Sequence, residues 1–191
     1  FAGAQPGLIH LDLRNISATI TRKIAAAENQ RGVKHLDAPV SGGDIGAKNA
    51  TLAIMVGGDE ETFQKCLSIF ETLGKRIIHI GPNGTGQITK AANQIMVAAQ
   101  MVAMSELLVL AQKAGADPEK VIEAIKGGAA QCWTLDVKPP RLFAGNRSPG
   151  FKASMQYKDL NIIMDLAKSF GVPLPATAAN TQLFNIMVTA G

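Results

Sequence analysis

Lys90, Asn93 and Gln94 are the residues whose types and spacing best match catalytic chemistry. They stand at positions i, i+3 and i+4 of a predicted helix, so an ammonium and two amides share one face of an otherwise apolar helix. Burial lowers the pKa of a lysine toward the working pH, and a nearby substrate carboxylate keeps it charged, so Lys90 is a candidate proton donor. The amides would then orient the hydroxyl and carboxylate oxygens of the substrate. Two structural interpretations stay open: Lys90 extends to solvent, or it pairs with a buried carboxylate.

A second candidate is Ser41-Gly42-Gly43, which directly follows a predicted strand. Open α/β sheets bind ligands beyond the carboxyl ends of their strands. Two glycines let backbone N–H groups approach an anion closely, and the serine hydroxyl adds a donor. The same tripeptide also occurs in ordinary loops, so an anion site and a plain turn both remain possible.

The glycine-rich stretch from Gly81 to Gly86 stands between a predicted strand and a predicted helix. Its glycines follow the order G-x-x-G-x-G, whereas a dinucleotide fingerprint requires G-x-G-x-x-G and an acidic residue about 20 positions later. The stretch therefore predicts a tight turn that lets a helix begin close to the sheet. Such a helix would still present its N-terminal amides to an anion.

The histidines and cysteines do not form a recognisable site in the sequence. His10, His35 and His79 lie in or beside predicted strands without a helical i+4 partner, which predicts buried or half-exposed sheet residues and no metal site or Ser-His-Asp arrangement. Cys66 and Cys132 lack the spacing of a zinc or redox motif, and we expect isolated thiols in a reducing compartment, the cytoplasm.

Composition narrows the class of protein. The chain has 191 residues, of which 47% are hydrophobic and 18% charged, which excludes disorder, a coiled coil and collagen. The net charge of +4 is spread along the chain with one tryptophan and one tyrosine, which disfavours a nucleic-acid surface and suits small anionic metabolites. The run from Ile95 to Met104 is too short and too polar at its edges to span a bilayer, so we expect a buried helix and no membrane partner.

The order of predicted elements positions these candidates. Strands alternate with helices as far as Gly81, and only helices follow, which predicts an α/β sheet domain next to an all-helical domain. Residues 41–46 are expected to form a loop. The helix that carries Lys90 is apolar around nearly its whole circumference and is expected to be wrapped by other helices. Ser17 or Thr19 is expected to cap the first helix, whose apolar face is Ile20, Ile24 and Ala27. The predicted strands are residues 8–13, 33–40, 52–56 and 76–80, and the predicted helices are 17–31, 59–73, 86–114, 119–126, 154–170 and 176–189.

Three motifs occur together in one order: LDAPVSGG at residues 36–43, GTGQITKAANQ at 84–94 and KDL at 158–160. With these motifs the chain resembles the β-hydroxyacid dehydrogenase family over nearly all of its length. The resemblance implies interconversion of a small hydroxy acid and its semialdehyde or ketone with NAD or NADP. It also implies a Rossmann-type fold of which residues 1–81 form the C-terminal part, the N-terminal half with its phosphate-binding glycines being missing. Residues 82–191 are then a helical substrate and dimerisation domain of a homo-oligomer.

The resemblance assigns roles to individual residues. Lys90 becomes the general acid/base, Ser41, Gly42 and Gly43 hold the substrate carboxylate, and Asn93 with Gln94 orients the substrate. The residues expected to approach the cofactor are Asn15, Phe151 and Lys158.

Some positions depart from the family pattern, and others distinguish one branch of the family from another. Arg14-Asn15 stands where the family usually carries Ser-Thr or Ser-Ser. Asn93-Gln94 and Gly127-Gly128 resemble the branch that reduces tartronate semialdehyde to glycerate, whereas Cys132-Trp133 resembles the 3-hydroxyisobutyrate dehydrogenase branch. The first branch is the favoured one. A non-catalytic dimerisation or interaction module is the alternative from another class of function, although such a module has no packing reason to keep the polar residues around Lys90.

Overall fold

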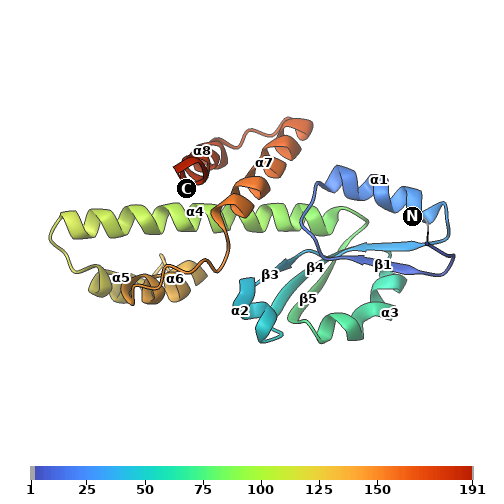
Figure 1. The fold of residues 1–191 in the computed structure, drawn as a ribbon, viewed down its shortest axis with the longest axis horizontal. Helices are drawn as coiled ribbons and strands as arrows, with labels where there is room; N and C mark the ends of the chain where they lie inside the picture. The colour runs from blue at the N-terminus through green and yellow to red at the C-terminus, as the bar shows by residue number, and fades with distance from the viewer. Residues whose placement is uncertain (1–2, 191) are drawn as a thin grey trace.

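A small mixed sheet and a group of helices are joined by one long helix (Figure 1). The structure is a computed structural model and describes residues 3–190. This architecture confirms the predicted α/β sheet followed by helices alone. The elements in chain order are β1 (Ile9–Asp12), α1 (Ala18–Asn29), β2 (Lys34–Asp37), β3 (Val40–Ser41), α2 (Gly43–Lys48), β4 (Leu52–Gly58), α3 (Glu60–Glu71), β5 (Gly74–Gly81), α4 (Thr85–Lys113), α5 (Pro118–Lys126), α6 (Trp133–Phe143), α7 (Ala153–Phe170) and α8 (Pro175–Ala190).

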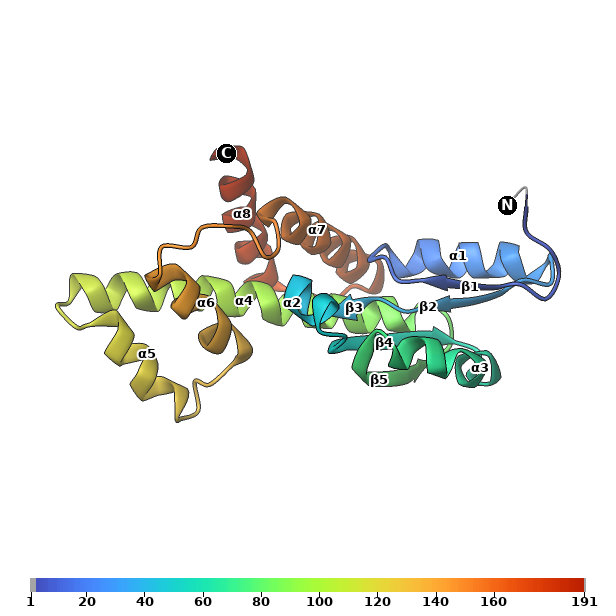
Figure 2. The ribbon, with the colours of Figure 1, turned by 60° about the horizontal axis from the view of Figure 1, so that its bottom comes forward.

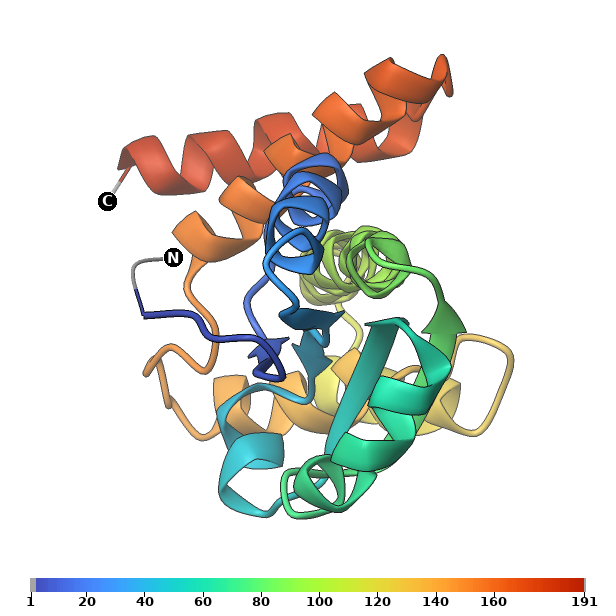
Figure 3. The same ribbon diagram turned by 90° about the vertical axis from the view of Figure 1, so that its right-hand side faces the viewer.

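The sheet is built around β4. Strand β5 pairs parallel with one of its edges, and β2 and β3 both pair antiparallel with the other, while β1 extends the sheet parallel to β2. Helices α1 and α4 cover one face and α3 covers the other (Figure 3). The core of this half is formed by apolar residues of the strands and α3, among which Leu36 and Phe70 are completely buried.

Three local predictions in this half were wrong. The single strand expected at 33–40 is divided into β2 and β3, because Ala38 bonds to β1 and Pro39, which has no N–H to donate, leads the chain over to β4. The loop expected at 41–46 contains the short helix α2, which begins at Gly43. Helix α1 begins after Ser17 without a side-chain cap, and its buried face carries Ala18, Thr21, Ala25 and Glu28 while Ile20 is 49% exposed.

Helix α4 is the helix against which the other helices of the helical half pack. Helices α7 and α8 pack on one side of it, and α5 and α6 pack near its C-terminal end (Figure 2). The expectation that it is wrapped by other helices was wrong, because Val109 and Leu110 are largely exposed, the latter to 71%. By length and composition alone α4 is apolar enough to cross a membrane, a test that core helices of soluble proteins also pass.

Helix α6 was not predicted. Pro139 and Pro140 lie within it, and a proline pair is a signal that normally ends a helix. Its first turn is held by packing instead, since Leu135 belongs to a buried cluster with Met104 and Leu108 of α4. Tertiary contact therefore outweighs the local sequence signal here.

Candidate active site

A buried aspartate fixes the start of α4. The carboxylate of Asp37, at the end of β2, accepts the backbone N–H of Gly84 at 2.8 Å and that of Gln87 at 3.1 Å. These are N–H groups that no helical carbonyl can reach, and a negative charge there also opposes the helix dipole. Gly84 adopts a φ of +90°, which places the turn in the left-handed region, as the glycine-rich stretch predicts. Lys90 is consequently held at a fixed distance from the sheet, on the second turn of a helix anchored by β2.

Lys90 is a buried lysine with one direct hydrogen-bond partner in the described chain. Its side chain lies on α4 with 9% of the residue exposed, and Nζ donates to Oε1 of Gln94 at 3.1 Å. Asn93 donates to the same oxygen through Nδ2 at 2.8 Å. The structure thus brings together the three polar residues that the i, i+3, i+4 spacing selected. It also shows that Lys90 does not extend freely to solvent.

Gln94 links Lys90 to helix α7 through hydrogen bonds. Its Nε2 donates to Oδ2 of Asp159 at 2.6 Å and to Oε1 of Gln156 at 3.0 Å. The amide of Gln156 in turn donates to the backbone carbonyl of Gln94 at 3.1 Å. Both Gln156 and Asp159 are buried, Asp159 to 3% exposure. The carboxylate that the sequence left open as a partner of Lys90 is therefore Asp159, and it acts through Gln94.

The environment of Lys90 shifts its acidity. Burial lowers the pKa of Lys90 to about 8, the Asp159 carboxylate raises this pKa, and the neighbouring Lys158 ammonium lowers it. Lys158 itself lies 2.9 Å from Oδ1 of Asp159, as an ion pair without hydrogen-bond geometry. A lysine with a pKa near 8 can exchange a proton near neutral pH, which is what general acid/base chemistry needs.

Hydrogen bonds from side chains of α4 and α7 hold the loop between β1 and α1. The side chain of Gln87 donates to the carbonyl of Arg14 at 2.8 Å and accepts the N–H of Ile16 at 3.2 Å. Lys158 donates to the carbonyl of Asn15 at 3.0 Å. Two of the expected cofactor residues, Asn15 and Lys158, are thus in contact although 143 positions separate them.

In the described part of the chain, the remaining candidates are not hydrogen-bonded to the network. Ser41 ends β3, which packs against α4, and Gly42 and Gly43 follow with φ values of +135° and +65°. Phe151 is 41% exposed in the segment between α6 and α7. Within residues 3–190, no hydrogen bond joins these four residues to Lys90, Gln94 or Asp159.

Sequence reasoning gave no role to Asp37, Gln87, Gln156 or Asp159. A signal for the last two was present, because Gln156 and Asp159 fall on the same helical face as Leu160 and Ile163, which are buried. Polar residues at buried positions of an amphipathic helix require partners, so they mark an internal network. The identity of the partner, Gln94, could not be read from the sequence.

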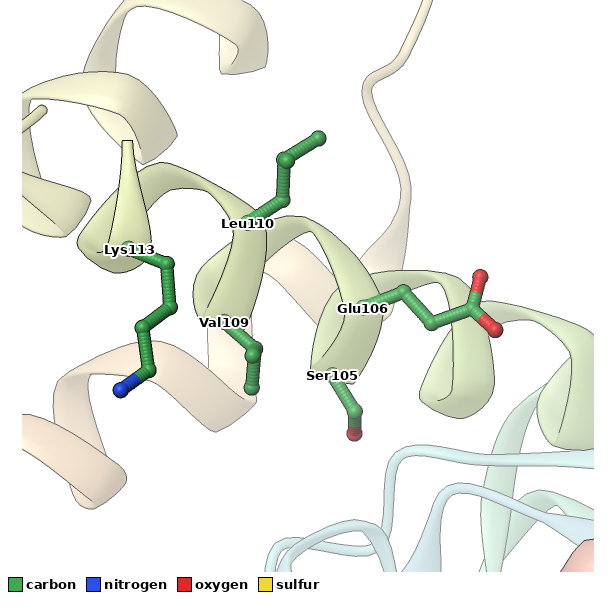
Figure 4. A pocket seen from close by; sticks show the side chains of 5 residues that line it. All are labelled: Ser105, Glu106, Val109, Leu110 and Lys113. Atoms are coloured by element: carbon green, nitrogen blue, oxygen red, sulfur yellow. The ribbon is translucent and has the colours of Figure 1, made fainter. Parts of the chain in front are cut away.

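A hollow of about 540 Å³ lies elsewhere on α4, lined by Ser105, Glu106, Val109, Leu110 and Lys113 (Figure 4). Its nearest lining residue, Ser105, lies roughly 22 Å along the helix from Lys90, at 1.5 Å per residue. Its side chains include none of the network described above. The hollow is part of the exposed apolar surface of α4 and is not the candidate site.

Two family models match consecutive parts of the chain. A sequence model described as the NAD-binding domain of NADP-dependent 3-hydroxyisobutyrate dehydrogenase matches residues 84–191. A second, described as the NAD binding domain of 6-phosphogluconate dehydrogenase, matches residues 1–81. The chain belongs to the β-hydroxyacid dehydrogenase family. This confirms the resemblance carried by the three motifs.

Individual relatives within this family are also similar over most of the chain. The 2-hydroxy-3-oxopropionate reductase of Escherichia coli (strain K12) is 46% identical over 181 residues, covering 95% of this chain and 62% of the relative. The probable 3-hydroxyisobutyrate dehydrogenase of Mycobacterium tuberculosis (strain H37Rv) is 36% identical over 91% of this chain and 62% of its own length. The solved structure of the Mycobacterium tuberculosis 3-hydroxyisobutyrate dehydrogenase with L-serine has a TM-score of 0.91 and 33% identity, covering 98% of this chain and 67% of that one. The chain thus spans less than two thirds of the length of these curated relatives.

Proposed function

We propose that this chain is the substrate-side part of an NAD(P)-dependent reductase that converts tartronate semialdehyde into glycerate, with Lys90 as general acid/base. The observation that carries the proposal is the buried Lys90–Gln94–Asp159 network, which holds a lysine with a pKa near 8 at the junction of α4, α7 and the loop before α1. The 46% identity to the Escherichia coli 2-hydroxy-3-oxopropionate reductase supports this substrate over others. In the proposed division, residues 1–81 belong to the cofactor domain and residues 82–191 to the helical domain.

The chemistry assigned to Lys90 is a proton transfer. During reduction the aldehyde carbon accepts a hydride and its oxygen becomes an alkoxide, to which Lys90 Nζ donates a proton. In the reverse direction neutral Lys90 removes the proton from the hydroxyl. Gln94 Oε1 accepts a hydrogen bond from Nζ and so directs the ammonium, while Asn93 shares the same oxygen and fixes its position.

Three residues are proposed to contact the cofactor: Asn15, Phe151 and Lys158. NADH or NADPH, when bound, would supply the hydride for reduction. Lys158 offers an ammonium and the Asn15 loop offers backbone and amide groups beside it, and the half-exposed ring of Phe151 lies in the segment leading into the same helix. These groups would contact the nicotinamide half, since the chain contains no G-x-G-x-x-G stretch that would hold the pyrophosphate.

The substrate carboxylate is assigned to Ser41, Gly42 and Gly43. A Cβ added to Gly43 would meet no atom within 4 Å, so the backbone there is open to an approaching anion. The chemistry of L-serine, the small hydroxylated acid named with the Mycobacterium tuberculosis structure, is close to that of glycerate. A three-carbon acid is therefore a reasonable size for this site.

Comparison of two semialdehydes tests the substrate. The assay uses an extended form of the chain, in which the residues needed to reach the length of the Escherichia coli relative are taken from that relative. Tartronate semialdehyde is expected to give a kcat/KM at least about tenfold higher than methylmalonate semialdehyde, equivalent to about 1.4 kcal/mol. The reverse order would favour 3-hydroxyisobutyrate dehydrogenase, and NAD(P)H binding without turnover of either would favour a non-catalytic module.

The pH dependence of the reaction follows from the acidity of Lys90. Reduction needs the protonated lysine, so kcat/KM for reduction is expected to fall as pH rises through about 8. Oxidation needs the neutral lysine, so kcat/KM in that direction is expected to rise through the same pH. The Asp159 carboxylate raises the pKa of Lys90, and Asp159→Asn removes this charge. The fall of kcat/KM for reduction and its rise for oxidation are therefore both expected to occur at lower pH in this variant.

The control for this measurement is Asp165→Asn, on the same helix α7 as Asp159. Its pH profile should match that of the unaltered extended form. The role given to Asp159 would be contradicted if the pH transitions of kcat/KM stayed in place in Asp159→Asn or moved to higher pH.

We also propose that a second copy of the chain covers the exposed apolar surface of the helical half, as expected of a homo-oligomer. Val109 and Leu110 on α4 and Ile186 and Met187 on α8 are all more than half exposed. Apolar surface of this kind normally marks an interface. Light scattering of the extended form should give at least a dimer, and a monomer would contradict it.

Cytoplasmic location is proposed from the free state of Cys66 and Cys132.

A further inference from the structure

Two histidines and one glutamate meet at a point that the proposed reaction does not use. Nδ1 of His10 lies 2.8 Å from Oε1 of Glu28, and Nδ1 of His35 lies 2.7 Å from Oε2 of the same carboxylate. The three ligand atoms offered by these side chains lie within 4.8 Å of one another. We propose that His10, Glu28 and His35 bind a divalent transition-metal ion of the zinc type.

The backbone sets up this meeting point. His10 on β1 and His35 on β2 are direct partners in the parallel register, so their side chains leave the same face of the sheet. Their rings lie 4.9 Å apart, edge to face. Glu28 comes from the last turn of α1, which packs over β2. Three different elements thus each direct one nitrogen or oxygen ligand to a common centre.

The charges at this centre favour a cation. Glu28 is 3% exposed, and a buried carboxylate needs a compensating positive charge. A divalent ion placed between the three ligand atoms would supply that charge directly. Nε2 of His35 has no hydrogen-bond partner in the described chain, so the polar contact that fixes this buried ring is the one its Nδ1 makes within the cluster.

The ligand set and its surroundings match zinc. Two histidines and one glutamate with an open fourth position is a known tetrahedral arrangement, with bonds of about 2.0–2.1 Å and hence ligand atoms roughly 3.3 Å apart. The present separations of 2.7 and 2.8 Å are those of hydrogen bonds, so the imidazoles move outward by roughly half an ångström when the ion binds. Each Nδ1 then coordinates through its lone pair, and the proton that it carried moves to Nε2 or is released to solvent. The His10 side chain is 34% exposed, which leaves a route for the ion and for a water ligand.

The site is separate from the proposed catalytic groups. Glu28 lies in the last turn of α1, whereas Asn15 and the Lys158 contact precede its first turn, roughly 18 Å away along the helix. The ion is therefore expected to tie α1 to β1 and β2 and to take no part in proton transfer. Binding should raise the Tm of the chain in a manner that depends on metal concentration.

Cobalt(II) is the probe for the site because its tetrahedral complexes absorb visible light. The 191-residue chain, freed of metal with a chelator, is titrated with Co²⁺ and then with Zn²⁺. We expect visible absorption that saturates at one Co²⁺ per chain and disappears when zinc replaces cobalt. Absence of saturable absorption would overturn the proposal and leave a metal-free hydrogen-bonded cluster.

Two variants identify the ligands, and one serves as a matched control. His10→Ala changes the half-exposed ligand and Glu28→Gln the buried one, and each is expected to weaken Co²⁺ binding by at least about tenfold. Glu60→Gln removes the other histidine–glutamate pair of the sheet, between Glu60 and His79, and should leave binding unchanged. Circular dichroism reports whether each variant is folded. Unchanged affinity in folded His10→Ala would reject the site even where Glu28→Gln fails to fold.

Discussion

Lys90→Met in the extended form is expected to lower kcat by roughly 10²- to 10⁴-fold while changing the dissociation constant of NAD(P)H by less than about twofold. Methionine has nearly the length of lysine and suits a buried position, so α4 and its packing against α7 should be kept. What is lost is the proton donor and its hydrogen bond to Gln94. Steady-state kinetics measure the first effect, and titration of cofactor fluorescence measures the second.

The matched control is Lys113→Met, which removes a lysine from the last turn of the same helix. Lys113 lies at the distant hollow and is expected to leave both kcat and cofactor binding unchanged. Turnover of Lys90→Met close to that of the unaltered form would reject Lys90 as the general acid/base. A large loss of cofactor binding in the same variant would assign Lys90 to binding instead of proton transfer.

Gly86→Ala is expected to destabilise the junction between the sheet and α4 by about 1–3 kcal/mol or more. A Cβ at this position would lie 2.4 Å from the carbonyl oxygen of Met55 and 2.5 Å from that of Asp37, and backbone atoms cannot move aside as a flexible side chain does. The helix must therefore shift away from β2 and β4 and loosen the two N–H bonds to Asp37. Because Lys90 is one turn further along, kcat of the extended form should fall as well.

Thermal unfolding followed by circular dichroism measures this effect as a lower Tm. The control is Gly127→Ala, since a Cβ there would meet only Ala124 O at 3.9 Å and the residue has an ordinary helical φ of −82°. That variant should change the free energy of unfolding by no more than about 0.5 kcal/mol. Equal Tm values for the two variants would show that α4 is not held as closely to the sheet as Gly86 indicates.

Local patterns predicted most of the secondary structure, because each element carries its own signal. The long helix was expected at 86–114 and lies at Thr85–Lys113, since its apolar periodicity and the preceding glycine turn are continuous in the sequence. The first and last strands of the sheet were likewise found close to their expected places. Local signals failed at α6, where Pro139 and Pro140 gave the wrong indication, and at α2, whose six residues are too few for a periodic pattern.

Local patterns were enough to predict the fold class and the grouping of Lys90, Asn93 and Gln94 on one helical face, because each element carries its own signal. The family could be predicted as well, since its three motifs occur in a fixed order along the chain. Three long-range contacts could be found only in the folded protein: Gln94 meets Asp159, 65 positions away, Asp37 anchors α4, and His10, Glu28 and His35 converge. The physical reason is that a side chain's local pattern shows that it is buried and polar, and hence needs a partner. Which partner it meets is fixed by the packing of whole elements, and that packing is set by apolar contacts distributed over the entire chain.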